Sequence, residues 1–126
     1  MKEIIHSHNA PQAIGAYSQA IKVGNTIYLS GQIPLIPSTM ELVNGSMQEQ
    51  LKQIFTNLSA VAKAANAELD NIVKLTVFLT DLSHYTVVNE VMENYFSQPY
   101  PARTLIGVAA LPKQVAVEID AILVLP

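Results

Sequence analysis

Two charged residues, Arg103 and Glu118, stand out because they lie in apolar stretches that resemble β-strands. The stretches Thr104–Ala109 and Val115–Leu125 are rich in Val, Ile and Leu, which favour strands with at least one buried face. Charged residues in such surroundings usually have a partner or a function. A guanidinium matches both oxygens of a carboxylate. A carboxylate such as that of Glu118 can hold a water molecule and move protons.

The two stretches are separated by Leu111-Pro112-Lys113, and this pattern predicts a β-hairpin centred near Leu111. Arg103 would then lie opposite Glu118 or Ile119, so that both charged groups could reach one pocket. Two interpretations are equally supported by the residues alone. Arg103 binds the carboxylate of a small anionic substrate, or it forms a cross-strand ion pair with Glu118 that only stabilises the hairpin.

The composition predicts one domain, residues 1–126, that associates with further copies of itself. Half of the residues are hydrophobic and 13% are charged, whereas roughly a quarter are charged in an average globular domain. A small monomer with so few charges would expose apolar surface, which subunit contacts can bury. A chain of this length can still form a single core.

Composition also excludes or disfavours several classes of function. The chain has no cysteine, which excludes disulfides, thiolate metal sites and a cysteine nucleophile. His6-Ser7-His8 has no third ligand nearby, so we predict no metal site. A net charge of −3 without a cluster of Lys or Arg disfavours nucleic acid as a partner. No signal peptide or membrane-spanning stretch is recognisable, so we expect no membrane partner and a cytoplasmic protein.

The strands predict an α+β fold. Ser18–Val23 and Thr26–Gly31 form a hairpin through Gly24-Asn25, a strong two-residue turn signal. Gln32–Gly45 is expected to be a loop, and Ile72–Leu79 a strand buried on both faces except at Lys74 and Thr76. The resulting order is β-β-α-β-α-β-β, a mixed β-sheet with two helices packed on one face.

Two amphipathic segments predict the helices. The first follows a capping box, in which Ser46 and Glu49 each satisfy a main-chain N–H, and it ends at Asn66-Ala67. The second runs from about Ser83 to Phe96, and Asn89 is expected on its solvated face. The residues of the second helix region that are expected to face inward are Leu82, Tyr85, Val88, Val91, Met92, Tyr95 and Phe96.

Motifs in both halves of the chain resemble one known family. They are Ala10-Pro11, Gly15–Ala20, Leu29–Pro34, Pro101–Thr104, Ala110–Pro112 and Val117–Ala121. Together they cover essentially the whole chain in order and resemble the reactive intermediate deaminase A (RidA/YjgF) family. The resemblance implies a chorismate-mutase-like α+β fold and a homotrimer with sites between subunits.

The same resemblance implies an enzyme, a 2-iminobutanoate/2-iminopropanoate deaminase. It would hydrolyse enamines and imines released by pyridoxal-phosphate enzymes, such as 2-aminoacrylate and 2-iminobutanoate, to 2-keto acids and ammonia. This is a hydrolysis of a C–N bond that requires no cofactor. The expected partners are therefore a small carboxylate-bearing imine or enamine and further copies of the chain.

The resemblance also implies roles for residues at matching positions. Arg103 would bind the substrate carboxylate, and Glu118 would hold the water. Tyr17, Ser30 and Gly31 would line the pocket, although the residues alone favour a half-buried tyrosine and a strand-end hydroxyl.

One position departs from the family pattern. Leu105 stands where many members carry a cysteine, which leaves the substrate range open. If the position contributes mainly its main-chain N–H, leucine preserves that contact. If a thiol shapes the pocket or reports oxidative state, this chain has lost that function. The larger side chain would also narrow the pocket and shift the choice of substrate.

Three other functions stay open. One is a trimer that binds 2-keto acids or related metabolites without turnover. Another is a ribonuclease, which the acidic pI of about 5.5 disfavours. The last is a structural protein in which Arg103 and Glu118 form only an ion pair.

Overall fold

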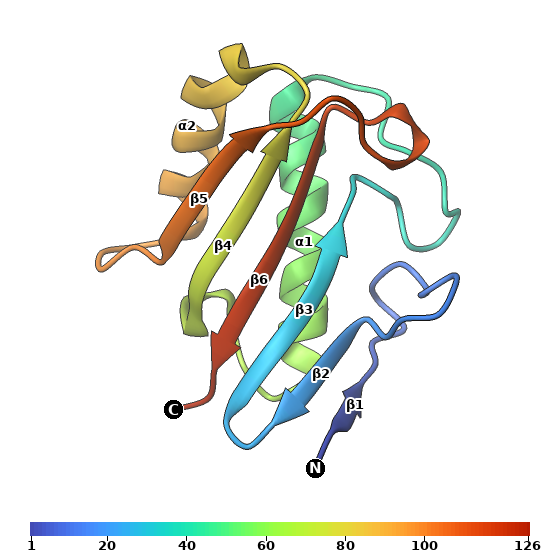
Figure 1. The fold of residues 1–126 in the computed structure, drawn as a ribbon, viewed down its shortest axis with the longest axis vertical. Coiled ribbons are helices and arrows are strands. Elements are labelled where there is room, and N and C mark those ends of the chain that lie inside the picture. Colours follow the sequence, from blue (N-terminus) through green and yellow to red (C-terminus); the bar gives the residue numbers. More distant parts are fainter.

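The computed structural model describes residues 1–126 and shows one mixed β-sheet with two helices on one of its faces (Figure 1). This arrangement confirms the predicted α+β class. The six strands lie in the order β1-β2-β3-β6-β4-β5. Helix α1 crosses behind the middle of the sheet, and α2 lies behind β4 and β5 (Figure 1). The other face of the sheet carries no helix.

The strands extend the predicted set by one. The first three are β1 (Glu3–Ile5), β2 (Ala20–Val23) and β3 (Thr26–Gln32), followed by β4 (Ile72–Leu79), β5 (Ala102–Gly107) and β6 (Val117–Val124). The first hairpin, β2–β3, is confirmed, with Val23 paired to Thr26 across the turn. Strand β1 was not predicted, because an isolated pair of isoleucines is too short to show alternation.

The predicted hairpin between the last two strands is wrong. Strand β5 pairs in parallel with β4, whereas β6 pairs antiparallel with the other edge of β4. The unit β4–α2–β5 is thus a crossover connection, which produces parallel neighbours. The chain then passes over the end of β4, where the Val108 N–H donates to the Leu79 carbonyl and the Thr80 N–H to the Ala116 carbonyl. A 3₁₀ turn at Pro112–Gln114 precedes β6.

Helix α1 spans Met47–Ala64, and its apolar stripe lies against the sheet as predicted. The Glu49 N–H donates to the Ser46 hydroxyl oxygen at 3.3 Å, which confirms half of the capping box. The carboxylate of Glu49 contacts the Ser46 hydroxyl at 3.3 Å. The left-handed residue Asn66, with φ of 60°, follows the helix end.

Helix α2 spans Tyr85–Tyr95, after a 3₁₀ turn at Leu82–His84. Its inward face is confirmed at four positions, which are buried: Val88, Val91, Met92 and Phe96. Two of the residues expected to face inward, Leu82 and Tyr85, are instead exposed. Leu82 lies in the 3₁₀ turn before the helix, and Tyr85 is the first residue of the helix.

The core lies between the sheet and the helices. Alternate residues of β4 and β6 point into it, among them Leu75, Val77 and Ile119, which are fully buried. Lys74 and Thr76 are not fully buried, as expected. Val73 is exposed and Phe78 is half-buried, so the prediction that the rest of this strand is buried on both faces is wrong for the single chain. No helix is long and apolar enough to cross a membrane.

Candidate functional site

Glu118 lies on the open face of the sheet, directly over the main chain of Gly31. Strand β3 bulges by one residue here, because Leu29 pairs with Ala121 while Gln32 pairs with Ile119. A Cβ added to Gly31 would clash with the Glu118 carboxylate oxygen Oε2 and lie 3.0 Å from Cδ. The absence of a side chain at Gly31 therefore lets the carboxylate rest against the strand.

A surface pocket of about 510 Å³ opens beside this carboxylate. Three irregular segments surround it: the N-terminal segment 11–17, the loop that follows β3, and the turn before β6, which lie together on the right of Figure 1. Tyr17, Gln19, Gly31, Lys113 and Glu118 contribute polar groups or main chain to its lining. The pocket thus combines a carboxylate with a mostly uncharged wall, which suits a small polar ligand.

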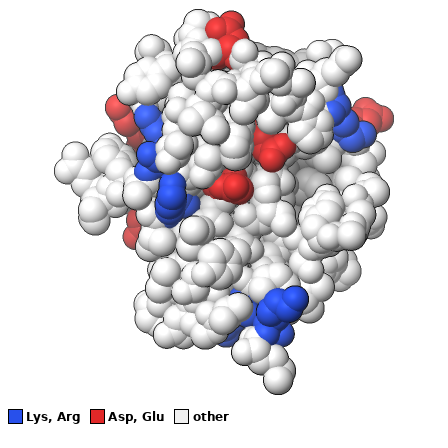
Figure 2. Space-filling model, viewed as in Figure 1, with Lys and Arg blue, Asp and Glu red and all other residues white.

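The environment of Glu118 favours its protonated form. Burial raises the pKa of the Glu118 carboxyl above its ordinary value, and the negative charge of Asp120 raises it further. In Figure 2 acidic atoms lie near the centre of the open face, whereas basic atoms lie toward its margins. A carboxyl group whose pKa is raised in this way keeps its proton to a higher pH than an ordinary glutamate, which suits it to donate a proton as well as accept one.

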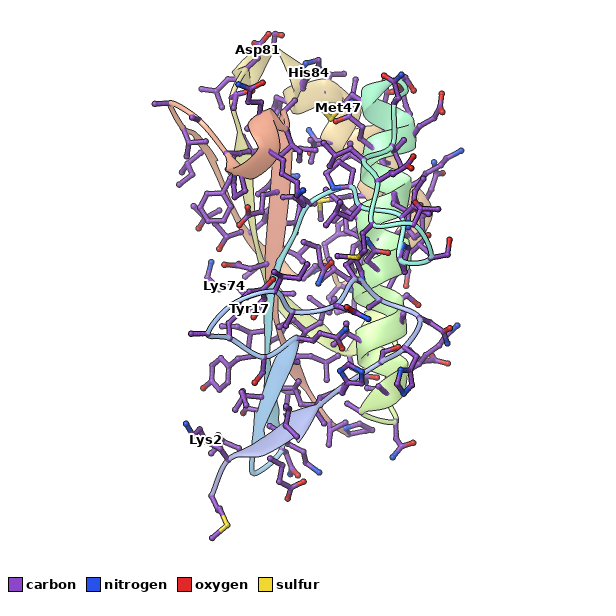
Figure 3. All side chains as sticks on the ribbon, turned by 90° about the vertical axis from the view of Figure 1, so that its right-hand side faces the viewer. Lys2, Tyr17, Met47, Lys74, Asp81 and His84 are labelled. Atoms are coloured by element: carbon purple, nitrogen blue, oxygen red, sulfur yellow. The ribbon has the colours of Figure 1, made fainter.

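The structure places Tyr17 and Ser30 at one end of the β2–β3 hairpin, as predicted. Tyr17 is 53% exposed, and it lies on the side of the sheet opposite α1 (Figure 3). Its hydroxyl oxygen accepts the Ile14 N–H at 3.2 Å, so its own hydrogen stays free to donate to a ligand. The Ser30 hydroxyl donates to the Ser18 carbonyl at 2.6 Å. Its single hydrogen is therefore occupied within the chain.

Arg103 lies in a separate cluster beneath α2. Its Nη1 donates to Asn89 Oδ1 at 2.7 Å and lies 3.4 Å from Met92 Sδ. The guanidinium carbon is 5.6 Å from the centre of the Tyr85 ring, within cation–π range. These contacts hold the guanidinium and leave most of its five N–H donors free to bind an anion.

Arg103 and Glu118 face opposite sides of the sheet. Arg103 pairs with Leu75, which points into the core, whereas Glu118 pairs with Phe78 of the same strand. Positions three apart on a strand point to opposite faces. Strand β4 also separates the two residues. The prediction that one hairpin brings both into one pocket is therefore wrong, and so is an ion pair between them within one chain.

Leu105 lies on the same face of the sheet as Arg103, and Asp120 lies on the same face as Glu118. Leu105 follows Arg103 by two positions on β5, so both side chains lie on the helix-covered face, where Leu105 packs on the rim of the core. Asp120 lies on the open face with Glu118 and pairs with Thr76 of β4.

The structure contains no group of three or more His, Cys, Asp or Glu side chains that could hold a metal.

Sequence reasoning missed two residues that hold these clusters. Asn89 was predicted to be solvated, but it is half-buried and bound to Arg103. Gln19 lines the pocket and is 3% exposed, with hydrogen bonds to the N-terminal segment. A polar residue next to a strand start carries no signal of burial, and the contact of Asn89 depends on the packing of α2 against β5.

The chain is similar over nearly its whole length to known proteins. The family model described as endoribonuclease L-PSP matches residues 7–125. A protein of Dermatophagoides farinae named 2-iminobutanoate/2-iminopropanoate deaminase is 45% identical, over 98% of this chain and 97% of its own length. The human protein of that name is 44% identical, over 97% of this chain and 89% of its own length.

A solved structure agrees with the sequence relatives. The crystal structure of RidA from the Antarctic bacterium Psychrobacter sp. PAMC 21119 superposes with a TM-score of 0.94 at 50% identity, covering 98% of this chain and 99% of that chain. At this level of identity, the similarity extends to the family as well as the fold.

Proposed function

The chain belongs to the endoribonuclease L-PSP family, and we propose that it hydrolyses small 2-imino acids and their enamine tautomers to 2-keto acids and ammonia. Relatives along the full chain are named 2-iminobutanoate/2-iminopropanoate deaminase. The observation that carries the proposal is the carboxyl of Glu118, which has a raised pKa and borders the pocket beside Gly31. As proposed, the reaction needs only water, a proton-transferring carboxyl group and a cation that binds the substrate.

The proposed reaction uses Glu118 as a proton carrier. As a carboxylate it takes a proton from a water molecule while the water oxygen bonds to the imine carbon. It returns that proton to nitrogen, which gives a carbinolamine. The carboxylate then takes the hydroxyl proton and delivers it to the amino nitrogen as the C–N bond breaks, which releases ammonia and leaves the keto group. An enamine such as 2-aminoacrylate is first protonated at its terminal carbon, for which protonated Glu118 is a suitable donor. General acid–base help of this kind accelerates a reaction by about 10²–10⁴-fold.

Arg103 would bind the substrate carboxylate. A charge-assisted contact of this type contributes about 1.5–3 kcal/mol, enough to orient a three- or four-carbon acid. Asn89 and Tyr85 hold the guanidinium in place beforehand, which reduces the entropy lost on binding. The main chain of Leu105, on the same strand, would complete this half of the site.

We propose that a complete site forms between two copies, with Arg103 from one chain and Glu118, Tyr17, Ser30 and Gly31 from its neighbour. Two observations support this proposal. Arg103 and Glu118 face opposite sides of the sheet in one chain, and the open face carries exposed Tyr28, at 51%, a large aromatic side chain that contact with a second copy would bury. A homotrimer, which the family resemblance implies, would repeat this contact by rotation and close the ring. We place the assembly in the cytoplasm.

A coupled assay tests the function. A pyridoxal-phosphate threonine dehydratase generates 2-iminobutanoate, and semicarbazide traps whatever imine survives. We expect wild-type protein to suppress formation of the semicarbazone. The Arg103→Ala variant is expected to lose this activity, whereas Lys52→Ala, which removes an exposed cation of α1, is expected to keep it. Semicarbazone formation that is unaffected by folded wild-type protein would refute the proposal for this substrate.

The variant Glu118→Gln distinguishes hydrolysis from the alternative function, which is binding of 2-keto acids without turnover. Both functions need the cation, but only hydrolysis needs a carboxyl that exchanges protons. We expect the variant to bind 2-ketobutyrate in calorimetry and to lose turnover. Turnover by Glu118→Gln at the wild-type rate would remove Glu118 from the mechanism. Binding without turnover in the wild type would favour the binding-only function.

A further inference from the structure

One wall of the pocket is formed by a segment that has almost no main-chain support. Residues 6–18 connect β1 to β2 and supply Pro11, Gln12, Ile14 and Tyr17 to the pocket lining. No main-chain hydrogen bond outside helices and strands involves any of these thirteen residues. The position of the segment therefore depends on side chains.

One side chain, that of Gln19, supplies most of that support. Its Oε1 accepts the Ser7 N–H at 2.7 Å, and its Nε2 donates to the Ser7 carbonyl at 3.0 Å. The same Nε2 donates to the Pro11 carbonyl at 2.9 Å and lies 3.4 Å from the Ala10 carbonyl oxygen. These bonds are buried, so water cannot substitute for them at little cost.

Gln19 also connects this segment to the strand beneath the catalytic carboxyl. Its own carbonyl accepts the Ser30 N–H at 2.9 Å, next to the bulge where Gly31 contacts Glu118. The residue two positions earlier is Tyr17, which faces the same pocket. One buried amide thus couples the pocket wall to the strand that carries the reactive group.

We propose that Gln19 is a positioning residue, which holds segment 6–18 as the wall of the pocket and thereby places Tyr17 and Pro11 against the substrate. This inference rests on the proposed deaminase function. The chemistry requires an amide at this position, because Oε1 must accept one N–H while Nε2 donates to carbonyl oxygens. A carboxylate lacks the donor, and an apolar side chain lacks both groups.

The test compares Gln19→Glu and Gln19→Met with Gln48→Glu, a matched change on the exposed first turn of α1. Near neutral pH we expect both Gln19 variants to lose about 10²-fold in kcat/KM, because the wall is displaced. Gln48→Glu is expected to match the wild type. Rates are expressed relative to wild type at each pH, so that the ionisable groups of this region that both proteins share affect both rates alike. These groups are His6, His8, Tyr17, Lys113 and Glu118.

The pH response distinguishes positioning from general damage. The new carboxyl of Gln19→Glu faces carbonyl oxygens, which favour its neutral form and raise its pKa. Below that pKa the carboxyl O–H can donate to the Pro11 carbonyl, while its C=O accepts the Ser7 N–H. We therefore expect Gln19→Glu to regain activity relative to wild type as the pH falls toward about 5, and Gln19→Met to regain none.

Hydrogen exchange gives a readout that needs no activity. In wild-type protein the amides of Ser7 and Ile14 are bonded to side chains, so a peptide covering residues 6–18 should be partly protected. We expect this protection to be lost in Gln19→Met and regained with falling pH in Gln19→Glu, with α1 unchanged as evidence of a folded chain. If Gln19→Met does not fold, Gln19→Glu at two pH values decides alone.

Two results would overturn the inference: wild-type kcat/KM with unchanged exchange in both Gln19 variants, or a deficit in Gln19→Glu that does not shrink at low pH. If the wild type itself does not hydrolyse imines, the proposed function fails. Exchange of residues 6–18 then decides the role of Gln19: faster exchange in the variants supports it, and unchanged exchange refutes it.

Discussion

Replacing Gly31 by alanine should impair catalysis with little effect on stability. The added methyl group would lie too close to the Glu118 carboxylate, at 3.0 Å from Cδ and 3.3 Å from Cγ, and would clash with Oε2. Ordinary carbon–carbon contacts are about 3.5–4.0 Å. The carboxyl carbon must therefore move by about 0.5–1 Å. Gly31 does not have a positive φ, so the main chain itself accepts alanine without strain.

The size of each effect follows from this geometry. A reacting group misplaced by about 1 Å can cost about 10²-fold in rate, which corresponds to about 2.7 kcal/mol in the activation barrier. Glu118 can move by rotating about its own side-chain bonds, at a cost of about 0.5–1.5 kcal/mol. We therefore expect Gly31→Ala to lower kcat/KM by about 10²-fold, while the free energy of unfolding falls by about 0.5–1.5 kcal/mol.

Gly24→Ala provides the matched control in the same hairpin. Gly24 has a φ of +60°, and nothing lies within 4 Å of an added Cβ. Alanine there should destabilise the fold by about 1 kcal/mol through strain in the main chain. The turn lies at the far end of β3 from the pocket, so activity at a temperature well below unfolding should not change.

Both variants can be measured with the semicarbazide assay and thermal unfolding. Wild-type kcat/KM in Gly31→Ala would show that the position of Glu118 over Gly31 has no catalytic importance. A melting temperature that falls more in Gly31→Ala than in Gly24→Ala would show that the lost activity reports instability of the fold instead.

Two further predictions concern Glu118 and Arg103. The folded-state pKa of Glu118 is raised, so its contribution to stability is fully present below its unfolded pKa and is lost as the pH rises through the folded pKa. Glu118→Gln should therefore melt above wild type near neutral pH and equal it in acid, as thermal scans over pH can check; equal melting temperatures at all pH values would contradict the raised pKa. Asn89→Ala removes the acceptor that holds Arg103 and should raise KM about tenfold with a smaller change in kcat, since a neutral hydrogen bond contributes about 0.5–1.5 kcal/mol and a charged one more. Steady-state kinetics at varied imine supply would detect this, and an unchanged KM would show that Arg103 needs no such support.

Periodicity in the sequence predicted the elements of the fold better than their arrangement. The four-turn apolar stripe of α1 and the Gly24-Asn25 turn are local signals, and both are confirmed. The neighbours of β6 are β3 and β4. Nothing in the sequence of β6 distinguishes these partners from β5, because apolar strand-forming residues do not by themselves specify which strand they pair with.

The same limit applied to the candidate site. The residue types of Arg103 and Glu118 indicated their chemistry, but their relative position depended on a strand order that local patterns do not contain. Tyr17 and Ser30 were placed correctly at one end of a hairpin, because a two-residue turn fixes the register. Gln19 and Asn89 act through contacts with segments 8 to 14 residues away, and single residues of these types carry no sign of such contacts.

In the shared site proposed above, Arg103 and Glu118 lie on opposite faces of one sheet, so each folded chain would carry two halves of a site and no complete one. The number of working sites would then follow the concentration of assembled protein. Dilution would then lower specific activity while every chain kept its secondary structure. By linkage, a 2-keto acid that contacts both halves of the site would also stabilise the assembly. The free energy by which the ligand strengthens the association of neighbouring chains equals the free energy by which association strengthens ligand binding.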